Sequence, residues 1–183
     1  MYDTQMDDKQ GLEVLASGKF MQMIRLGRWE YARRHTCDGA VAVIATTNEG
    51  ELLLVEQMRV PMGTNCLELP AGLVGDTQAD KGEAMLDAAK RELLEETGYT
   101  ATTFEHLYPV ATSPGFSNEM IDLFRATGLT QQHAGGGVDH ENIHVHRVKL
   151  NELDSWLSER QSQGAIIDAK VYFAAAMLLR EAS

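Results

Sequence analysis

The sequence has little positive charge for its length, and this shortage narrows the range of functions. Only 16 Lys and Arg residues stand against 27 Asp and Glu among 183 residues, so the formal net charge is −11. A protein that binds duplex nucleic acid needs a basic surface, and this balance therefore argues against that class of partner. It does not argue against a phosphate-bearing substrate, because bound metal ions would invert the local charge.

Cysteines and long apolar runs are also scarce. Cys37 and Cys66 have no zinc-type spacing, and we expect both to be buried small apolar residues in a reducing compartment. The longest apolar run, residues 171–179, is too short to span a bilayer. Residues 1–8 are acidic and lack the apolar core of a signal peptide. We therefore expect a soluble cytoplasmic protein, with no membrane association and one domain or one domain with a small appendage.

The elements predicted along the chain are mainly strands, with one helix in the middle and two at the end. A turn signal, Asn-Glu-Gly at 48–50, separates two apolar runs and predicts a β-hairpin over 39–58. Residues 29–34 are also expected to be extended, following the first two predicted strands. The predicted strands are 12–15, 20–26, 39–46, 51–58, 66–69, 104–111, 120–127 and 141–148, and the predicted helices are 82–97, 151–161 and 167–181.

The middle helix carries an unusual group of acids. Residues 91–96, Arg-Glu-Leu-Leu-Glu-Glu, form its last turns, and Gly98 is well placed to end it. Glu92, Glu95 and Glu96 fall within an arc of about 100°. They repel one another and lie near the negative end of the helix dipole. A solvated acidic face is one interpretation, but a hard divalent cation such as Mg²⁺ would remove both penalties.

A second acidic segment follows a run of glycines late in the chain. Gly135, Gly136 and Gly137 are conformationally loose residues that precede Asp139 and Glu141. One interpretation is a plain linker. The other is a mobile loop that delivers its acids to a site when substrate binds.

The spacing of the acids decides between the interpretations of the helix. Residues 83–99 read Glu-x7-Arg-Glu-Leu-x-Glu-Glu-x-Gly-Tyr. This resembles the signature of the Nudix hydrolases, Gly-x5-Glu-x7-Arg-Glu-U-x-Glu-Glu-x-Gly-U, where U is apolar. The first glycine of that signature would stand at Thr77, and its equivalent here is Gly72, so the 74–82 loop carries about five extra residues. Loop insertions cost little free energy, so the extra residues do not change the match of the helix positions to the signature.

Shorter runs outside the signature resemble the ADP-ribose pyrophosphatase branch of that family. A proline about fifteen residues after the signature, here Pro114, is a marker of the branch. The resemblance implies an α+β fold, an α/β/α sandwich around a mixed sheet in a Nudix hydrolase domain at 39–183. It also implies an N-terminal antiparallel strand extension at 1–38 that builds a homodimer and helps to shape each pocket. The matching runs are Trp-Glu at 29–30, Glu-Gln-Met-Arg at 56–59, Glu-Leu-Pro-Ala-Gly at 68–72 and Ser-Pro-Gly at 113–115.

The implied reaction is metal-dependent hydrolysis of the pyrophosphate bond of ADP-ribose, giving AMP and ribose 5-phosphate, or of a related nucleoside diphosphate sugar. The cofactor would be Mg²⁺, with Mn²⁺ as the alternative, at two or three ions per site. Matching motif to motif, Glu92 and Glu96 would be the principal ligands. Glu95 would be a third or supporting ligand, and the backbone carbonyl of Ala71 another.

The resemblance also implies a general base on the late loop. Glu141 is favoured because it immediately precedes a predicted strand, and Asp139 could serve instead or bind a further metal. Glu95 is the next candidate for the base. Arg91 and Glu83 would orient the metal ligands.

Substrate contacts are implied at five positions. Trp29 would stack on the nucleobase, with Glu30 reading the base edge, although packing in the core or in an interface is the alternative for Trp29. Arg34 and Arg59 would contact phosphate or stack on a base, and Leu73 would line the substrate site.

Two rival functions share these features. The substrate could instead be GDP-mannose or another nucleotide sugar, which the metal site cannot distinguish. The protein could also be a non-catalytic module that binds ADP-ribose. The intact acids of the signature argue against that second rival.

Overall fold

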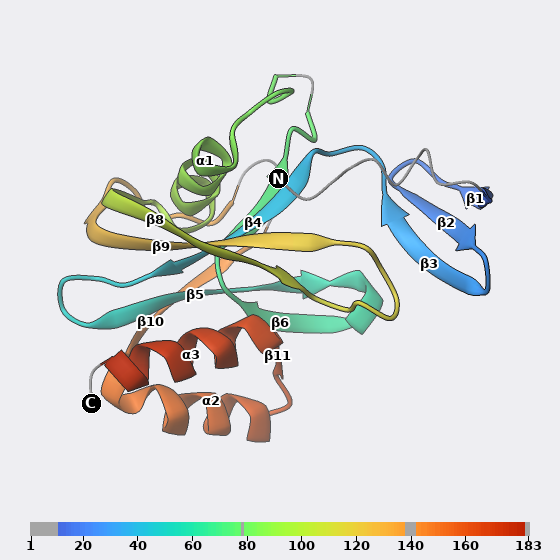
Figure 1. The fold of residues 1–183 in the computed structure, drawn as a ribbon. Coiled ribbons are helices and arrows are strands. Elements are labelled where there is room, and N and C mark those ends of the chain that lie inside the picture. The colour runs from blue at the N-terminus through green and yellow to red at the C-terminus, as the bar shows by residue number, and fades with distance from the viewer. Residues whose placement is uncertain (1–10, 78, 138–141, 182–183) are drawn as a thin grey trace.

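The computed structural model describes residues 11–77, 79–137 and 142–181. Two four-stranded mixed sheets form the central layer of the body (Figure 1). The strands of the first sheet are, in order, β7 (Ala71–Val74), β4 (Gly39–Ala45), β9 (Met120–Gln131) and β8 (Tyr99–Ala111). Those of the second are β10 (His144–Lys149), β5 (Glu51–Arg59), β6 (Thr64–Glu68) and β11 (Ile166–Ile167).

Helices cover both sides of this layer. Helix α1 (Met85–Thr97) lies on one side, and α2 (Leu153–Ser162) and α3 (Ala169–Glu181) lie on the other (Figure 1). Alternate residues of one strand face opposite sides. Val43 of β4 accordingly packs in the cluster that contains the apolar face of α1, whereas its neighbour Ile44 packs with α2 and α3. The expected α/β/α sandwich is confirmed.

The prediction of a β-hairpin over residues 39–58 is wrong, because its two strands do not pair with each other along their length. Strands β4 and β5 belong to different sheets, and they share only the antiparallel bridge between Thr46 and Leu52. Strand β4 instead pairs with β7 on one side and, in parallel, with β9 on the other. Strand β4 and residues 52–55 of β5 are apolar on both faces, and such stretches have no alternation that would select a particular neighbour.

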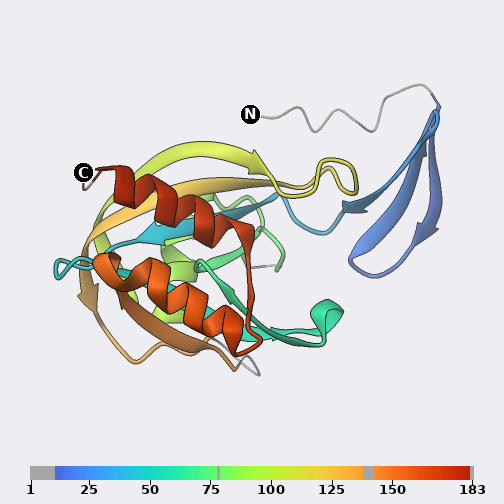
Figure 2. The ribbon, with the colours of Figure 1, turned by 90° about the horizontal axis from the view of Figure 1, so that it is seen from below.

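A separate antiparallel sheet precedes the body, as expected. Strands β1 (Leu12–Ser17), β2 (Met21–Leu26) and β3 (Trp29–Arg34) form it, and it stands to one side of the two larger sheets (Figures 1 and 2). The Ala32 N–H donates to the Phe116 carbonyl at 2.8 Å, which attaches β3 to the loop between β8 and β9. The boundary at residue 38 stays a prediction.

Several element bounds differ from those predicted. Helix α1 begins at Met85, three residues later than expected, and ends at Gly98 as expected, with φ 76°. Strands β7 and β11 were not predicted, because each is very short. Two 3₁₀ helices, Val60–Met62 and Leu150–Glu152, complete the described elements. Among the described residues, no helix is long and apolar enough to cross a membrane.

Candidate active site

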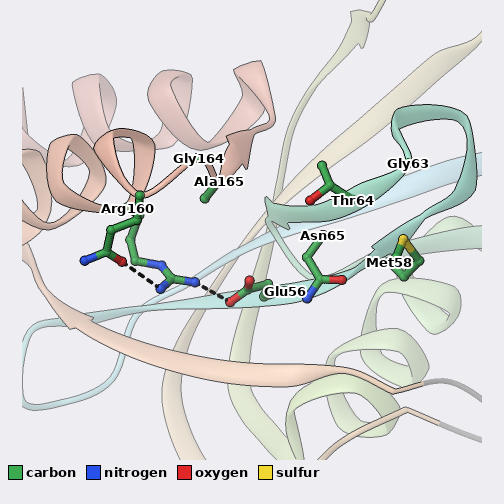
Figure 3. Close-up of a pocket in the computed structure, with 9 residues that line it drawn as sticks. Glu56, Met58, Gly63, Thr64, Asn65, Arg160, Gly164 and Ala165 are labelled. Atoms are coloured by element: carbon green, nitrogen blue, oxygen red, sulfur yellow. Dashed lines mark hydrogen bonds and ion pairs between the residues drawn. The ribbon is translucent and has the colours of Figure 1, made fainter.

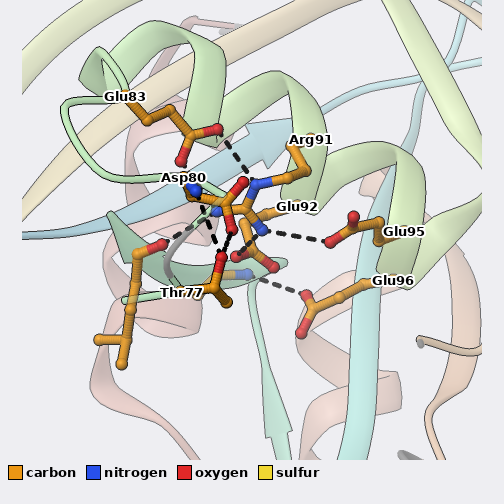
Figure 4. Close-up of polar contacts among 9 residues, drawn as sticks. Thr77, Asp80, Glu83, Arg91, Glu92, Glu95 and Glu96 are labelled. Atoms are coloured by element: carbon orange, nitrogen blue, oxygen red, sulfur yellow. Dashed lines mark hydrogen bonds and ion pairs between the residues drawn. The ribbon is translucent and has the colours of Figure 1, made fainter. Parts of the chain in front are cut away.

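An arginine lies at the centre of the acidic group on α1. Arg91 Nη1 donates to Glu92 at 2.6 Å and to Glu95 at 3.2 Å, while Nε and Nη2 bind Glu83 at 3.1 and 3.0 Å (Figure 4). Hydrogen bonding to Glu83 and the charge of Glu92 raise the pKa of the Arg91 guanidinium above its ordinary value. Arg91 therefore stays charged and offsets part of the repulsion among the carboxylates.

Strand β7 is attached to the same turns of α1. The Ala71 N–H donates to Glu96 Oε2 at 2.9 Å, and Arg91 Nη2 donates to the Leu73 carbonyl at 3.0 Å. Between them, a Cβ on Gly72 would lie 2.0 Å from the Glu92 carboxylate, so a larger residue has no room there. This close approach supports Gly72 as the equivalent of the first glycine in the Nudix signature.

The loop between β7 and α1 forms its own short turn, in which Thr77 and Asp80 hydrogen-bond to each other through their side chains (Figure 4). The Asp80 N–H also donates to Thr77 Oγ1 at 3.2 Å, and the Glu83 N–H donates to the Asp80 carbonyl at 2.9 Å. The extra residues therefore make local contacts just before the helix.

The chemistry of this group fits a hard divalent cation. Its carboxylate oxygens are the donor type that such an ion prefers, and Gly72 leaves the space that the Glu92 carboxylate needs. Within the described residues, no three His, Cys, Asp or Glu side chains are already gathered in a metal-binding arrangement. Arg91 instead contacts both Glu92 and Glu95.

Glu68 is a buried acid to which the sequence alone assigned no role. It is 6% exposed and forms a two-bond ion pair with Arg59, at 2.5 and 2.7 Å. Hydrogen bonding to Glu68 raises the pKa of Arg59. By alternation along β5, Arg59 lies on the same side as Leu53, which packs with α1. The signal for Glu68 was its place at the start of the Glu-Leu-Pro-Ala-Gly run.

Three predicted substrate contacts belong to the N-terminal sheet. Trp29 is 57% exposed, which excludes core packing within the protomer, and Glu30 pairs with Arg25 at 2.8 Å. Arg34 pairs with Glu119 at 3.1 Å, beside the loop that holds β3. Figures 1 and 2 show this sheet away from α1. One chain therefore does not bring Trp29 and Glu30 to the acidic helix.

The late glycine run is hydrogen-bonded to the end of α1. The Gly136 N–H donates to the Glu96 carbonyl at 2.9 Å, and the Gly137 N–H donates to the Glu95 carbonyl at 3.0 Å. These hydrogen bonds contradict a plain linker at 135–137, whereas the mobile loop that delivers its acids to a site stays a prediction. The candidate bases, Asp139 and Glu141, lie outside the described residues.

A separate hollow of about 360 Å³ lies on the α2 side of β5 (Figure 3). Glu56 lines it and accepts hydrogen bonds from Arg160 and His146, each at 2.8 Å. Because Glu56 and Met58 alternate with Arg59 along β5, this hollow opens on the face opposite to Arg59. None of the α1 carboxylates lines it.

An acidic helix end fixed to a glycine-containing strand, within an α/β/α sandwich, defines a protein of the Nudix class. The NUDIX domain model matches residues 38–172, and the chain belongs to the Nudix family. The ADP-ribose pyrophosphatase of Bacillus subtilis is 36% identical over 178 residues, covering 93% of this chain and 91% of that protein. The methanol dehydrogenase activator of Bacillus methanolicus is 40% identical over 146 residues, covering 79% and 74%.

Two further similarities extend the comparison. The ADP-sugar pyrophosphatase of Mus musculus is 35% identical over 159 residues, covering 79% of this chain and 70% of that protein. A crystal structure of an ADP compounds hydrolase superposes with a TM-score of 0.69, covering 93% of this chain and 90% of that one. Its sequence is 21% identical, so this similarity shows the fold alone.

Proposed function

We propose that this Nudix pyrophosphohydrolase cleaves the pyrophosphate bond of ADP-ribose or a related ADP-sugar, releasing AMP and a sugar phosphate. The observation that carries the proposal is the group of three acids on α1, held in place by Arg91 and β7. Relatives named ADP-ribose pyrophosphatase and ADP-sugar pyrophosphatase, aligned over most of their length, support this substrate class.

The chain supplies the groups that such a reaction needs. The family works with divalent metal ions, which neutralise pyrophosphate charge and lower the pKa of an attacking water. We propose Mg²⁺, or Mn²⁺ in its place, at two or three ions per site. Glu92, Glu95, Glu96 and the Ala71 carbonyl would hold them, and Arg91 orients the first two carboxylates.

Arg59 and the late loop complete the proposed reaction. The Arg59 side chain is 42% exposed beside its ion pair with Glu68, and we propose that its guanidinium also binds a substrate phosphate. Glu141, with Asp139 as the alternative, would take the proton of the attacking water. Leu73, which lies on β7 next to Gly72, would line the substrate site.

Product analysis tests the substrate. ADP-ribose, ADP-glucose and GDP-mannose are incubated with and without Mg²⁺, and the products are separated by chromatography. We expect AMP and sugar phosphate from the ADP-sugars only when the cation is present. Faster release of GMP from GDP-mannose would indicate that GDP-mannose is the preferred substrate. A protein named GDP-mannose pyrophosphatase, from Cronobacter sakazakii, is 31% identical to this chain. ADP-ribose binding without turnover would indicate the non-catalytic module.

We further propose that the protein works in the reducing cytoplasm. Cys37 and Cys66 are free thiols, Cys66 buried as expected and Cys37 only partly buried, and desolvation raises the pKa of each. Thiols kept in the protonated form are poor nucleophiles and poor redox centres. Neither cysteine therefore shows a redox role of its own.

A homodimer is the first prediction that follows. The N-terminal sheet exposes several apolar side chains, and Trp29 and Glu30 reach a substrate only if the sheet approaches the site of a second chain. Light scattering at micromolar concentration should therefore give twice the 20.2 kDa mass of one chain. A fully active monomer would contradict this prediction. The exposed side chains are Val14, Met21, Met23 and Trp29 on the strands and Phe20 in the turn between β1 and β2.

Trp29→Ala is expected to raise KM about tenfold and to change kcat much less. Stacking of an aromatic side chain on a base is worth roughly 1–3 kcal/mol, and the base lies far from the reacting phosphorus. Steady-state kinetics with ADP-ribose measures both constants. Phe20→Ala is the matched control, because Phe20 is a similarly exposed aromatic residue, 54% against 57%, in the turn between β1 and β2 of the same sheet. Equal effects of the two variants, with loss of the dimer, would assign Trp29 to the interface instead.

A further inference from the structure

The end of α1 that carries Glu95 and Glu96 is completed by a distant part of the chain. The last four carbonyls of a helix have no partners within the helix. Here Gly98 satisfies the Leu94 carbonyl at 2.8 Å, as a helix-ending glycine commonly does. The next two carbonyls, those of Glu95 and Glu96, accept from Gly137 and Gly136, about forty residues later.

Glycine is required at the centre of this contact. Residues 135, 136 and 137 have φ values of 74°, 117° and 80°, in the region that L side chains rarely adopt. A Cβ on Gly135 would also lie 2.5 Å from the Thr97 carbonyl carbon and 2.6 Å from the Glu96 carbonyl oxygen. Real side chains do not approach backbone this closely, so the helix end would have to move.

The glycine segment is held from its other side as well. The Ile143 N–H donates to the Gly136 carbonyl at 3.3 Å, and Ile143 is 6% exposed. Upstream, the Gln132 N–H donates to the Gly98 carbonyl at 2.8 Å. The segment is therefore anchored to the core at Ile143 and to the residue that ends α1.

We propose that Gly135, Gly136 and Gly137 form a positioning segment that fixes the backbone of Glu95 and Glu96, so that their carboxylates bind a divalent cation. The inference rests on the proposed function. Groups that hold metal ligands from behind typically change metal affinity 10–100-fold when they are altered. Here the supporting groups are backbone N–H donors, so no side chain is needed. The positive φ values explain why the residues are glycines.

The test compares Gly135→Ala with Gly50→Ala. Both glycines have φ 74°, but a Cβ on Gly50 has no atom within 4 Å, so the control carries the backbone strain without the clash. Calorimetric titration of folded protein with Mn²⁺, without substrate, measures the metal Kd directly. We expect Gly135→Ala to raise the Kd at least about tenfold. Gly50→Ala should bind Mn²⁺ as the wild type does, although both variants lose stability to a similar backbone strain.

Each outcome decides between the possibilities. Unchanged Mn²⁺ affinity in Gly135→Ala, or equal loss in both variants, would overturn the positioning role. Failure of the wild-type protein itself to bind Mn²⁺ would overturn the proposed metal-dependent function instead. If circular dichroism shows that Gly135→Ala does not fold, Gly136→Ala decides. Its Cβ would meet only the Ile143 carbonyl oxygen, at 3.9 Å. An L residue rarely adopts φ 117°, so the N–H that donates to the Glu96 carbonyl would shift, and weakened Mn²⁺ binding is again expected.

Discussion

Glu96→Gln is expected to lower turnover by at least about 100-fold at saturating Mg²⁺. Removal of one positioned electrostatic group in an active site typically has an effect of this size. Glu96 is 4% exposed, and its Oε2 accepts the Ala71 N–H at 2.9 Å. Glutamine keeps the shape and an acceptor oxygen for that bond. The substitution therefore removes the negative charge with little change in the attachment of β7 to α1.

The measurement is kcat with ADP-ribose over a Mg²⁺ titration, together with the thermal unfolding midpoint. Glu105→Gln provides the control, because Glu105 is an exposed acid on β8 and its loss changes the net charge equally. Wild-type turnover in Glu96→Gln would remove Glu96 from the proposed metal ligands. A loss of turnover accompanied by a large drop in the unfolding midpoint would indicate a structural role.

The second large effect is expected for Glu141→Gln, a loss of about 10²–10⁴-fold in kcat with substrate affinity largely kept. General-base catalysis contributes in this range, whereas the α1 carboxylates would still hold the metals. Glu141 stands two residues before the buried Ile143, and Asp139 stands two residues after Gly137, which is bonded to Glu95. Of the described residues on either side of them, Gly137 contacts the end of α1 directly and Ile143 does so through Gly136.

Asp139→Asn is the matched variant for this prediction and should lower kcat less than Glu141→Gln does. kcat and substrate affinity are measured for both variants at saturating Mg²⁺. A large loss in Asp139→Asn with a small one in Glu141→Gln would give the base role to Asp139. Normal turnover in both variants would move it to Glu95.

The sequence predicted α1 well because its information is local and redundant. The spacing of the acids, the position of Gly98 and the matching signature all indicated one helix end, and the structure has it there. The resemblance also placed the first signature glycine at Gly72, but it did not predict how closely Gly72 approaches the Glu92 carboxylate. The roles of these residues in metal and substrate binding stay predictions.

The errors arose where distant contacts decide the structure. The turn at 48–50 connects β4 and β5 but does not determine which sheet each strand joins. The glycines at 135–137 looked loose because nothing near them in the sequence could hold them. Their partners, the carbonyls of Glu95 and Glu96, lie about forty residues earlier. Glu68 gave little signal for the same reason, because its partner Arg59 lies on another strand.

The parallel pairing of β4 and β9 affects the order in which the chain can fold. Ala40 of β4 is paired with Ile121 of β9, so one edge of this apolar strand stays without its neighbour until about 80 more residues have been made. Contacts between residues so far apart in sequence slow folding, because loop closure costs entropy before the contact forms. Until then β4 presents an exposed apolar edge of the kind that pairs with other chains. Growth at high temperature or strong overexpression should therefore direct this protein toward aggregates through β4.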